Sequence, residues 1–198
     1  MLGRLSVFWS EKHTAYVEPF AGSACLFFEL APRRAILGDA NEQLIELFEV
    51  VRDDPDRLHR RLLRIRRDLE TYTRWRRLNP NSLDRETRAL RFFYLNRNCF
   101  NGIYRTNRDG QFNVPMGSKL SAYIGRADLK ECSAILKNTT LVAGDFIDTL
   151  AHVKKGNFVY LDLFAVSTRE TKLGTSRRED FWFIVAARSE DEAEIRAA

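Results

Sequence analysis

Acidic residues stand at the ends of four short apolar segments of the chain. The segments are YV, AIL, TLVA and FVYL, and the acids at their ends are Glu18, Asp39, Asp145 and Asp162. In an open α/β sheet the ligand lies beyond the carboxyl ends of the strands, so acids at successive strand ends are expected to converge. One such acid often only caps a helix, but four are harder to explain by capping alone. The acids therefore predict a shared ligand site.

The turn that follows Glu18 indicates which ligand this site would accept. In EPFAGSA, Gly22 lets the backbone turn sharply and approach a ligand closely. The turn lacks the GxGxxG pattern, and the acid before it would repel a diphosphate, which disfavours a nicotinamide-dependent enzyme. S-adenosylmethionine carries a sulfonium, an ammonium and a ribose diol, all of which an acid-rich rim can hold. We therefore expect S-adenosylmethionine as the cofactor.

The segments that must position these acids alternate between strand and helix. TAYVEPFAGSACLFFEL predicts a strand at residues 15–17 and a helix after the turn, and RAILGDANEQLIELFEVV repeats the scheme with a strand at residues 35–37. Apolar strands return in TTLVAGDF and NFVYLDLF. This alternation is typical of βαβ units and predicts a mostly parallel sheet with helices on its faces. We assign this α/β domain to residues 1–50 and 136–198.

Residues 51–135 interrupt the alternation and are predicted to form an inserted module. Apolar residues at intervals of three or four from Leu58 to Trp75 indicate an amphipathic helix, and a second helix is expected over residues 84–95. The motif NRDGQFNV predicts a hairpin around Asp109-Gly110. Residues 52–77 hold ten arginines against five acids, a charge that attracts polyanions such as nucleic acid. For any single arginine, a solvated helix face is an equal alternative.

The composition bears on the cellular location of the protein and on whether it holds disulfides or a metal ion. The longest apolar runs are too short to cross a membrane, and the N-terminus lacks the features of a secretory signal, so we expect a cytoplasmic protein without a membrane partner. The three cysteines never form a CxxC pair, and the three histidines are far apart. These spacings predict neither a disulfide framework nor a metal site.

Four blocks, taken in order, resemble the Dam-type (D12 class) DNA adenine-N6 methyltransferases: EPFAGSA, GDANEQLI, YLNRNCFNGIYRTNRDGQFNVPMG and FVYLD. The third block, residues 94–117, resembles the DNA-binding hairpin of that family nearly residue for residue. The similarity covers roughly residues 14–162. It implies a Rossmann-like S-adenosylmethionine-dependent methyltransferase sheet, incomplete in this chain, with residues 51–135 as a helical and β-hairpin DNA-recognition module. The implied partner is double-stranded DNA.

The resemblance also assigns roles to individual residues. It places Glu18, Phe20 and Gly22 around the methionine part of the cofactor. It places Asp39 at the ribose hydroxyls, and Asp145 and Phe146 beside the adenine. Phe100 and Asn101 match positions that wedge into the duplex, Arg105 matches a guanine reader, and Ile103 and Pro115 match contacts to a thymine methyl. Arg97 and Asn113 complete the expected DNA contacts. These matches favour a GATC-like site. The alternative is a plain β-hairpin whose Asn and Gly residues serve turns and whose Phe100, Tyr104 and Phe112 pack inward.

The catalytic motif departs from the family. The family uses Asp-Pro-Pro-Tyr to accept the hydrogens of the adenine amine and to stack on the flipped base, whereas this chain has Asp162 followed by Leu163, Phe164 and Ala165. Loss of a stacking partner costs about 1–3 kcal/mol, so we predict low or absent methyl transfer. The alternative is a non-catalytic DNA-binding module with a vestigial cofactor pocket. An incomplete sheet also predicts self-association or a partner subunit.

Overall fold

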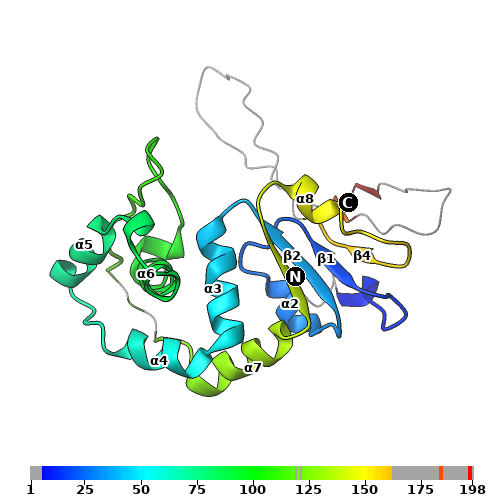
Figure 1. Ribbon diagram of the computed structural model, residues 1–198, viewed down its shortest axis with the longest axis horizontal. Helices are drawn as coiled ribbons and strands as arrows, with labels where there is room; N and C mark the ends of the chain where they lie inside the picture. Colours follow the sequence, from blue (N-terminus) through cyan, green and yellow to red (C-terminus); the bar gives the residue numbers. More distant parts are fainter. Residues whose placement is uncertain (1–5, 119, 121, 162–182, 185–195, 198) are drawn as a thin grey trace. The chain divides into compact units, whose positions relative to one another are not determined.

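The computed structural model describes residues 6–118, 120, 122–161, 183–184 and 196–197 of the 198-residue chain (Figure 1). The described chain packs into two compact units. One contains the residues up to 40 and those from 138 onward, and the other contains residues 41–137. These units differ from the predicted domains, 1–50 with 136–198 and 51–135, by about ten residues at the first boundary. The predicted domain boundaries stay a prediction.

The first unit is built on a parallel sheet. Its strands are β1 (Tyr16–Glu18), β2 (Ala35–Asp39), β3 (Thr139–Ala143) and β4 (Phe158–Val159), in the order β3-β2-β1-β4. Every pairing is parallel, with Glu18 beside Leu37 and Asp39 beside Ala143. The predicted α/β class with a mostly parallel sheet is confirmed. Parallel pairing also brings the ends of β1, β2 and β3 to one edge, which Figure 1 lets the reader follow.

Helices and aromatic side chains cover this sheet. The helices are η1 (Ser6–Phe8), α2 (Cys25–Leu30) and α8 (Phe146–Leu150), and the short pair β5 (Phe183–Ile184) and β6 (Arg196–Ala197) is antiparallel. Tyr16 and Val17 in β1 are fully buried. The ring of Tyr16 packs against those of Trp9, Phe27 and Phe158. This aromatic cluster is the core that fixes the position of β1, because large rings dominate the area removed from water.

The second unit is helical. It contains α3 (Glu42–Asp53), α4 (Pro55–Leu63), α5 (Leu69–Arg77), η2 (Pro80–Ser82), α6 (Arg85–Asn98), η3 (Phe100–Gly102) and α7 (Arg126–Leu136). The prediction of a single amphipathic helix from Leu58 to Trp75 is wrong, since α4 ends at Leu63 and a separate helix, α5, begins at Leu69. Asp68 explains the break: its carboxylate accepts a hydrogen bond from the backbone N–H of Thr71 over 2.7 Å and so starts a new helix. Asp84 starts α6 in the same way through Thr87.

Two further properties concern only the part of the chain that the structure describes. None of its helices combines the length and the apolar character that a bilayer crossing requires. Nor do three or more histidine, cysteine or acidic side chains gather there in an arrangement that could hold a metal ion.

Candidate functional site

The acids that end β1 and β2 lie on neighbouring strands, and the turn that follows β1 is hydrogen-bonded to the end of β2. Asp39 Oδ2 accepts a hydrogen bond from the backbone N–H of Gly22 over 2.9 Å. The N–H of Ala21 donates to the carbonyl of Gly38 over 2.8 Å. Glu18, Gly22 and Asp39 therefore meet at the carboxyl edge of the sheet, where ligands of open α/β folds bind.

Glu18 is buried, with only 3% of its surface exposed. Its carboxylate accepts a hydrogen bond from the hydroxyl of Tyr16 over 2.9 Å. The two side chains share a face because residues two apart in a strand point the same way. Sequence reasoning did not single out Tyr16, although the spacing of two in the strand was a usable signal. The hydrogen bond satisfies part of a carboxylate that burial would otherwise destabilise.

Gly22 leaves open space at the rim. Its φ is +47°, a conformation that favours glycine, and a Cβ added there would meet no atom within 4 Å. Phe20, half-buried in the same turn, stacks on Phe146 with the ring centroids 5.5 Å apart. Phe146 begins α8, directly after the loop that follows β3. The rim therefore combines two acids, an approachable backbone and an apolar aromatic wall.

Asp145 has a structural task at this rim. Its carboxylate accepts a hydrogen bond from the N–H of Ile147 over 2.9 Å, and Asp148 accepts one from the N–H of Asp145 over 3.1 Å. This capping box starts α8. The loop also reaches β2, because the N–H of Gly144 donates to the carbonyl of Asp39 over 3.1 Å. Of the four strand-end acids, Asp162 lies outside the described residues.

The second group of candidate residues lies on the hairpin of the helical unit. Antiparallel bridges join Cys99 to Met116 and Thr106 to Phe112, and Gly110 takes a φ of +73° in the turn. The predicted hairpin around Asp109-Gly110 is confirmed. Its return strand alternates in burial: Phe112 and Val114 are buried, while Asn113 and Pro115 are exposed. The alternation follows from the period of two along a strand.

The residues expected to contact DNA are all exposed, and they lie on this hairpin and on the segment before it: Arg97, Phe100, Asn101, Ile103, Arg105, Asn113 and Pro115. Phe100 and Ile103 are 48% and 47% exposed, so both present apolar surface to solvent near each other in the chain. Arg97 is engaged, since its guanidinium donates twice to the carbonyl of Ala122. The plain-hairpin alternative is right for Phe112, which packs inward, and wrong for Phe100, which is exposed. Tyr104 is 37% exposed and packs one side of its ring against Phe112 and Phe92.

The D12 class N6 adenine-specific DNA methyltransferase family model matches residues 5–162. The chain belongs to this family. It is 33% identical over 187 residues to Type II methyltransferase M1.LlaDCHI of Lactococcus lactis subsp. cremoris, with 89% of this chain and 65% of the relative covered. It is 35% identical over 164 residues to Type II methyltransferase M.MjaIII of Methanocaldococcus jannaschii, with 74% and 57% covered. The DNA adenine methylase of Escherichia coli K12 is 32% identical over 159 residues, with 76% and 56% covered. The chain thus spans between 56% and 65% of the length of these relatives.

The hairpin of this D12-class chain rests on a buried polar node that sequence reasoning missed. Asn98, fully buried, accepts a hydrogen bond from Arg67 Nε over 2.6 Å. Its amide donates to the carbonyl of Tyr94 and to the hydroxyl of Tyr123. Buried amides need such partners because an unsatisfied one destabilises the fold. The partners lie 4 to 31 residues away in the chain, so no local pattern marked them.

Helix α5 also supports the hairpin, through hydrogen bonds to the backbone of its return strand. The hydroxyl of Tyr72 donates to the carbonyl of Val114 over 2.9 Å, and Arg76 approaches the same carbonyl at 3.4 Å. Burial raises the pKa of Tyr72, so its hydroxyl stays protonated as a donor. Buried Arg91 donates to the carbonyls of Trp75 and Arg76 at the end of α5. The return strand of the hairpin is therefore anchored to a packed helix.

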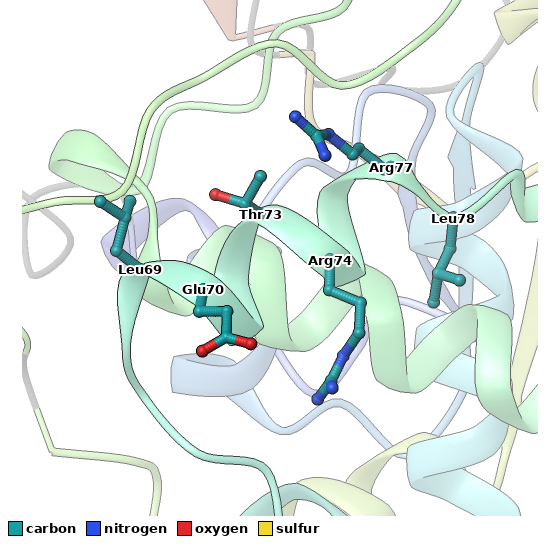
Figure 2. Close-up of a pocket in the computed structure, with 6 residues that line it drawn as sticks. All are labelled: Leu69, Glu70, Thr73, Arg74, Arg77 and Leu78. Atoms are coloured by element: carbon teal, nitrogen blue, oxygen red, sulfur yellow. The ribbon is translucent and has the colours of Figure 1, made fainter.

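An open groove runs along the outer face of α5. Two adjacent rows of side chains line it, which Figure 2 shows, and successive members of each row are about one turn apart: Leu69, Thr73 and Arg77 in one row, and Glu70, Arg74 and Leu78 in the other. Arg74 and Arg77 are exposed. Within the described part of the chain they have no hydrogen-bond or ion-pair partner, whereas Arg57 and Arg61 pair with Glu86. These arginines of α4 and α5 thus fall into two groups: Arg57 and Arg61 form ion pairs within the protein, whereas Arg74 and Arg77 face solvent.

Proposed function

We propose that this chain is the S-adenosylmethionine-binding and DNA-recognition part of a site-specific DNA adenine-N6 methyltransferase. The observation that carries the proposal is the meeting of Glu18, Gly22 and Asp39 at the carboxyl edge of a parallel sheet, with Asp39 bonded to the Gly22 backbone. Family membership supports the reaction class. Two of the relatives are named Type II methyltransferases, and a third is named DNA adenine methylase. These names describe the relatives and support the same reaction for this chain.

The rim fits S-adenosylmethionine by the chemistry of its groups. The Asp39 carboxylate suits a ribose diol, and the acidic Glu18 suits a region near a cationic methionine part. Phe20 and Phe146 offer a flat apolar wall to a purine ring, while the open space at Gly22 allows close approach. Asp145 would border the adenine from its capping position on α8. When bound, the cofactor supplies an activated methyl group, and these residues orient it.

The hairpin fits a DNA duplex. Phe100 and Asn101 offer an exposed wedge, and Asn101 has a φ of +53° that turns the chain at this tip. Arg105 is exposed and matches a guanine reader, while Ile103 and Pro115 are exposed apolar partners for a thymine methyl. Arg74 and Arg77 on α5 add charge for backbone phosphates. We propose a GATC-like site and, because the substrate is DNA, a cytoplasmic location.

Methyl transfer by this chain is expected to be weak, because Leu163, Phe164 and Ala165 replace the family Pro-Pro-Tyr. We would compare the chain with a Leu163→Pro, Phe164→Pro, Ala165→Tyr variant, using labelled S-adenosylmethionine and a duplex containing GATC. The variant is expected to transfer at least tenfold more label, since base stacking and the carbonyl acceptor are restored. Equal transfer by both proteins would contradict this explanation, and transfer to cytosine would contradict the reaction class.

A second candidate function is DNA binding without catalysis, with a vestigial cofactor pocket. It is favoured by Leu163 and Ala165 and by the engagement of Asp145 in a helix cap. Calorimetry with S-adenosylmethionine discriminates between the two functions. Binding that Asp39→Asn weakens supports the methyltransferase, whereas duplex binding without detectable cofactor binding supports the second function. Self-association through the sheet stays a prediction, and size-exclusion chromatography tests it.

A further inference from the structure

A side-chain hydrogen bond crosses the exposed face of the hairpin. Arg105 Nε donates to Asn113 Oδ1 over 2.9 Å, beside the backbone bond from the N–H of Asn113 to the carbonyl of Arg105. Both side chains are exposed. In solvent, a hydrogen bond of this kind adds little to folding, because water offers the same groups equivalent partners. Its main physical effect is therefore to restrict the orientation of the guanidinium.

Asn113 is the fixed partner of this pair. Its neighbours Phe112 and Val114 are 7% and 3% exposed, so the strand cannot rotate without exposing both. The carbonyl of Val114 is also held by the buried hydroxyl of Tyr72 over 2.9 Å. The backbone of Asn113 consequently has a position that the core of the helical unit determines, and its short side chain keeps the amide oxygen close to that position. Arg105, in the exposed stretch of the hairpin, takes its orientation from that oxygen.

The hydrogen bond to Asn113 does not use the terminal nitrogens of Arg105, which are the part of the guanidinium that can read a base. A guanidinium has five N–H donors in a rigid plane, and Nε carries only one of them. With Nε on Asn113, the two terminal nitrogens keep their own donors, and as a pair they match the O6 and N7 acceptors of guanine. We propose that Asn113 is a positioning residue, which orients Arg105 for guanine before DNA binds. The proposal rests on the proposed function, in which Arg105 reads guanine.

The expected effect is on discrimination between bases. A side chain that is already ordered loses less freedom on binding, and the ordering of one flexible side chain corresponds to about a threefold to tenfold change in affinity. Removing the Asn113 oxygen should therefore lower the preference for guanine by that factor. A direct phosphate contact by Asn113 would instead act equally on all duplexes, since phosphates carry no sequence information.

Two duplexes measure the preference. Both contain one central GATC, and in the second each guanine of the site is 7-deazaguanine, which lacks the N7 acceptor. Fluorescence anisotropy with the 198-residue chain gives the ratio of the two dissociation constants at one salt concentration. We expect Arg105→Ala to abolish the preference and Asn113→Ala to reduce it about threefold to tenfold. Asn113→Asp should keep the preference while weakening both complexes, because its carboxylate still accepts from Nε but repels phosphate.

The control is Arg108→Ala, which removes another exposed arginine from the same hairpin and should weaken both complexes equally. Circular dichroism verifies that each variant is folded. An unchanged ratio in Asn113→Ala with weaker binding of both duplexes would overturn the proposal and make Asn113 a phosphate contact. Loss of the ratio in Asn113→Asp would also overturn it. If Arg105→Ala keeps the preference, or the unaltered chain binds neither duplex, the proposed function itself has failed.

Discussion

The contact between Gly38 and Thr149 makes β2 intolerant of a side chain one residue before Asp39. A methyl group added at Gly38 would lie 1.8 Å from Thr149 Oγ1 and 2.8 Å from its Cβ. Thr149 is fully buried in α8, and among the described residues its hydroxyl has no hydrogen-bond partner. Gly38→Ala must therefore push α8 away from the sheet.

The size of the effect follows from the overlap. Ordinary contact begins at 3.4 Å, so the two atoms must separate by about 1.6 Å in a packed interior. Overpacking costs about 1–3 kcal/mol, and the full burial of Thr149 places the expected loss near the upper value. Because both elements share the separation, β2 would also shift, and the carboxylate of Asp39 would lose its geometry toward the N–H of Gly22. We expect S-adenosylmethionine affinity to fall roughly tenfold, the equivalent of one charge-assisted hydrogen bond.

Urea unfolding and calorimetry measure the two effects. A second substitution, Thr149→Ala, removes the overlapping hydroxyl and should restore most of the lost free energy of unfolding in the double variant. The matched control is Gly110→Ala, where the φ of +73° strains the new residue but no atom lies within 4 Å, so about 1 kcal/mol is expected. The reasoning is refuted if Gly38→Ala unfolds at the wild-type urea concentration, or if Thr149→Ala does not rescue it.

Further predictions concern charge, the hairpin anchor, pH and the cofactor. The double substitution Arg74→Ala, Arg77→Ala should reduce the slope of log affinity for duplex DNA against log salt by about 1.8, whereas Arg57→Ala, which removes an ion-paired arginine, should change it less; equal slopes would exclude phosphate contacts at the α5 groove. Tyr72→Phe should lower the free energy of unfolding by about 1 kcal/mol through loss of the bond to Val114, and an unchanged urea midpoint would argue against an anchoring role. Hydrogen bonds from Arg126 and Lys130 hold the pKa of the Asp56 carboxyl well below its usual 3.8, so its stabilisation is present above pH 3.8 and is lost as the pH falls further. The stability difference between wild type and Asp56→Asn should accordingly shrink below pH 3.8 in urea titrations, and a constant difference would speak against the ion pair. Asp39→Asn should weaken S-adenosylmethionine binding in calorimetry while leaving duplex affinity unchanged, and parallel loss of both would indicate misfolding instead.

The sequence by itself determined the features that depend on neighbouring residues. Alternating apolar segments placed β1, β2 and β3 within two residues of their observed bounds, and Asp109-Gly110 located the hairpin turn. The α/β class followed from the order of these segments along the chain. The acids at the ends of β1 and β2 could be paired in advance, since parallel strands end at the same edge.

Only the tertiary structure decided which chemically similar residues have different tasks. Arg91 is buried against the end of α5 while Arg74 faces solvent, and both lie on basic helices that look alike in sequence. Asp145 caps α8, whereas Asp39 ties a distant turn to β2.

The pair of Arg105 and Asn113 and the overlap of Gly38 with Thr149 join residues 8 and 111 positions apart. Such pairs depend on strand register and on the approach of α8 to β2. Local propensity determines neither the register nor this approach, because it depends on a few neighbouring residues. Packing, by contrast, brings together residues from the whole chain.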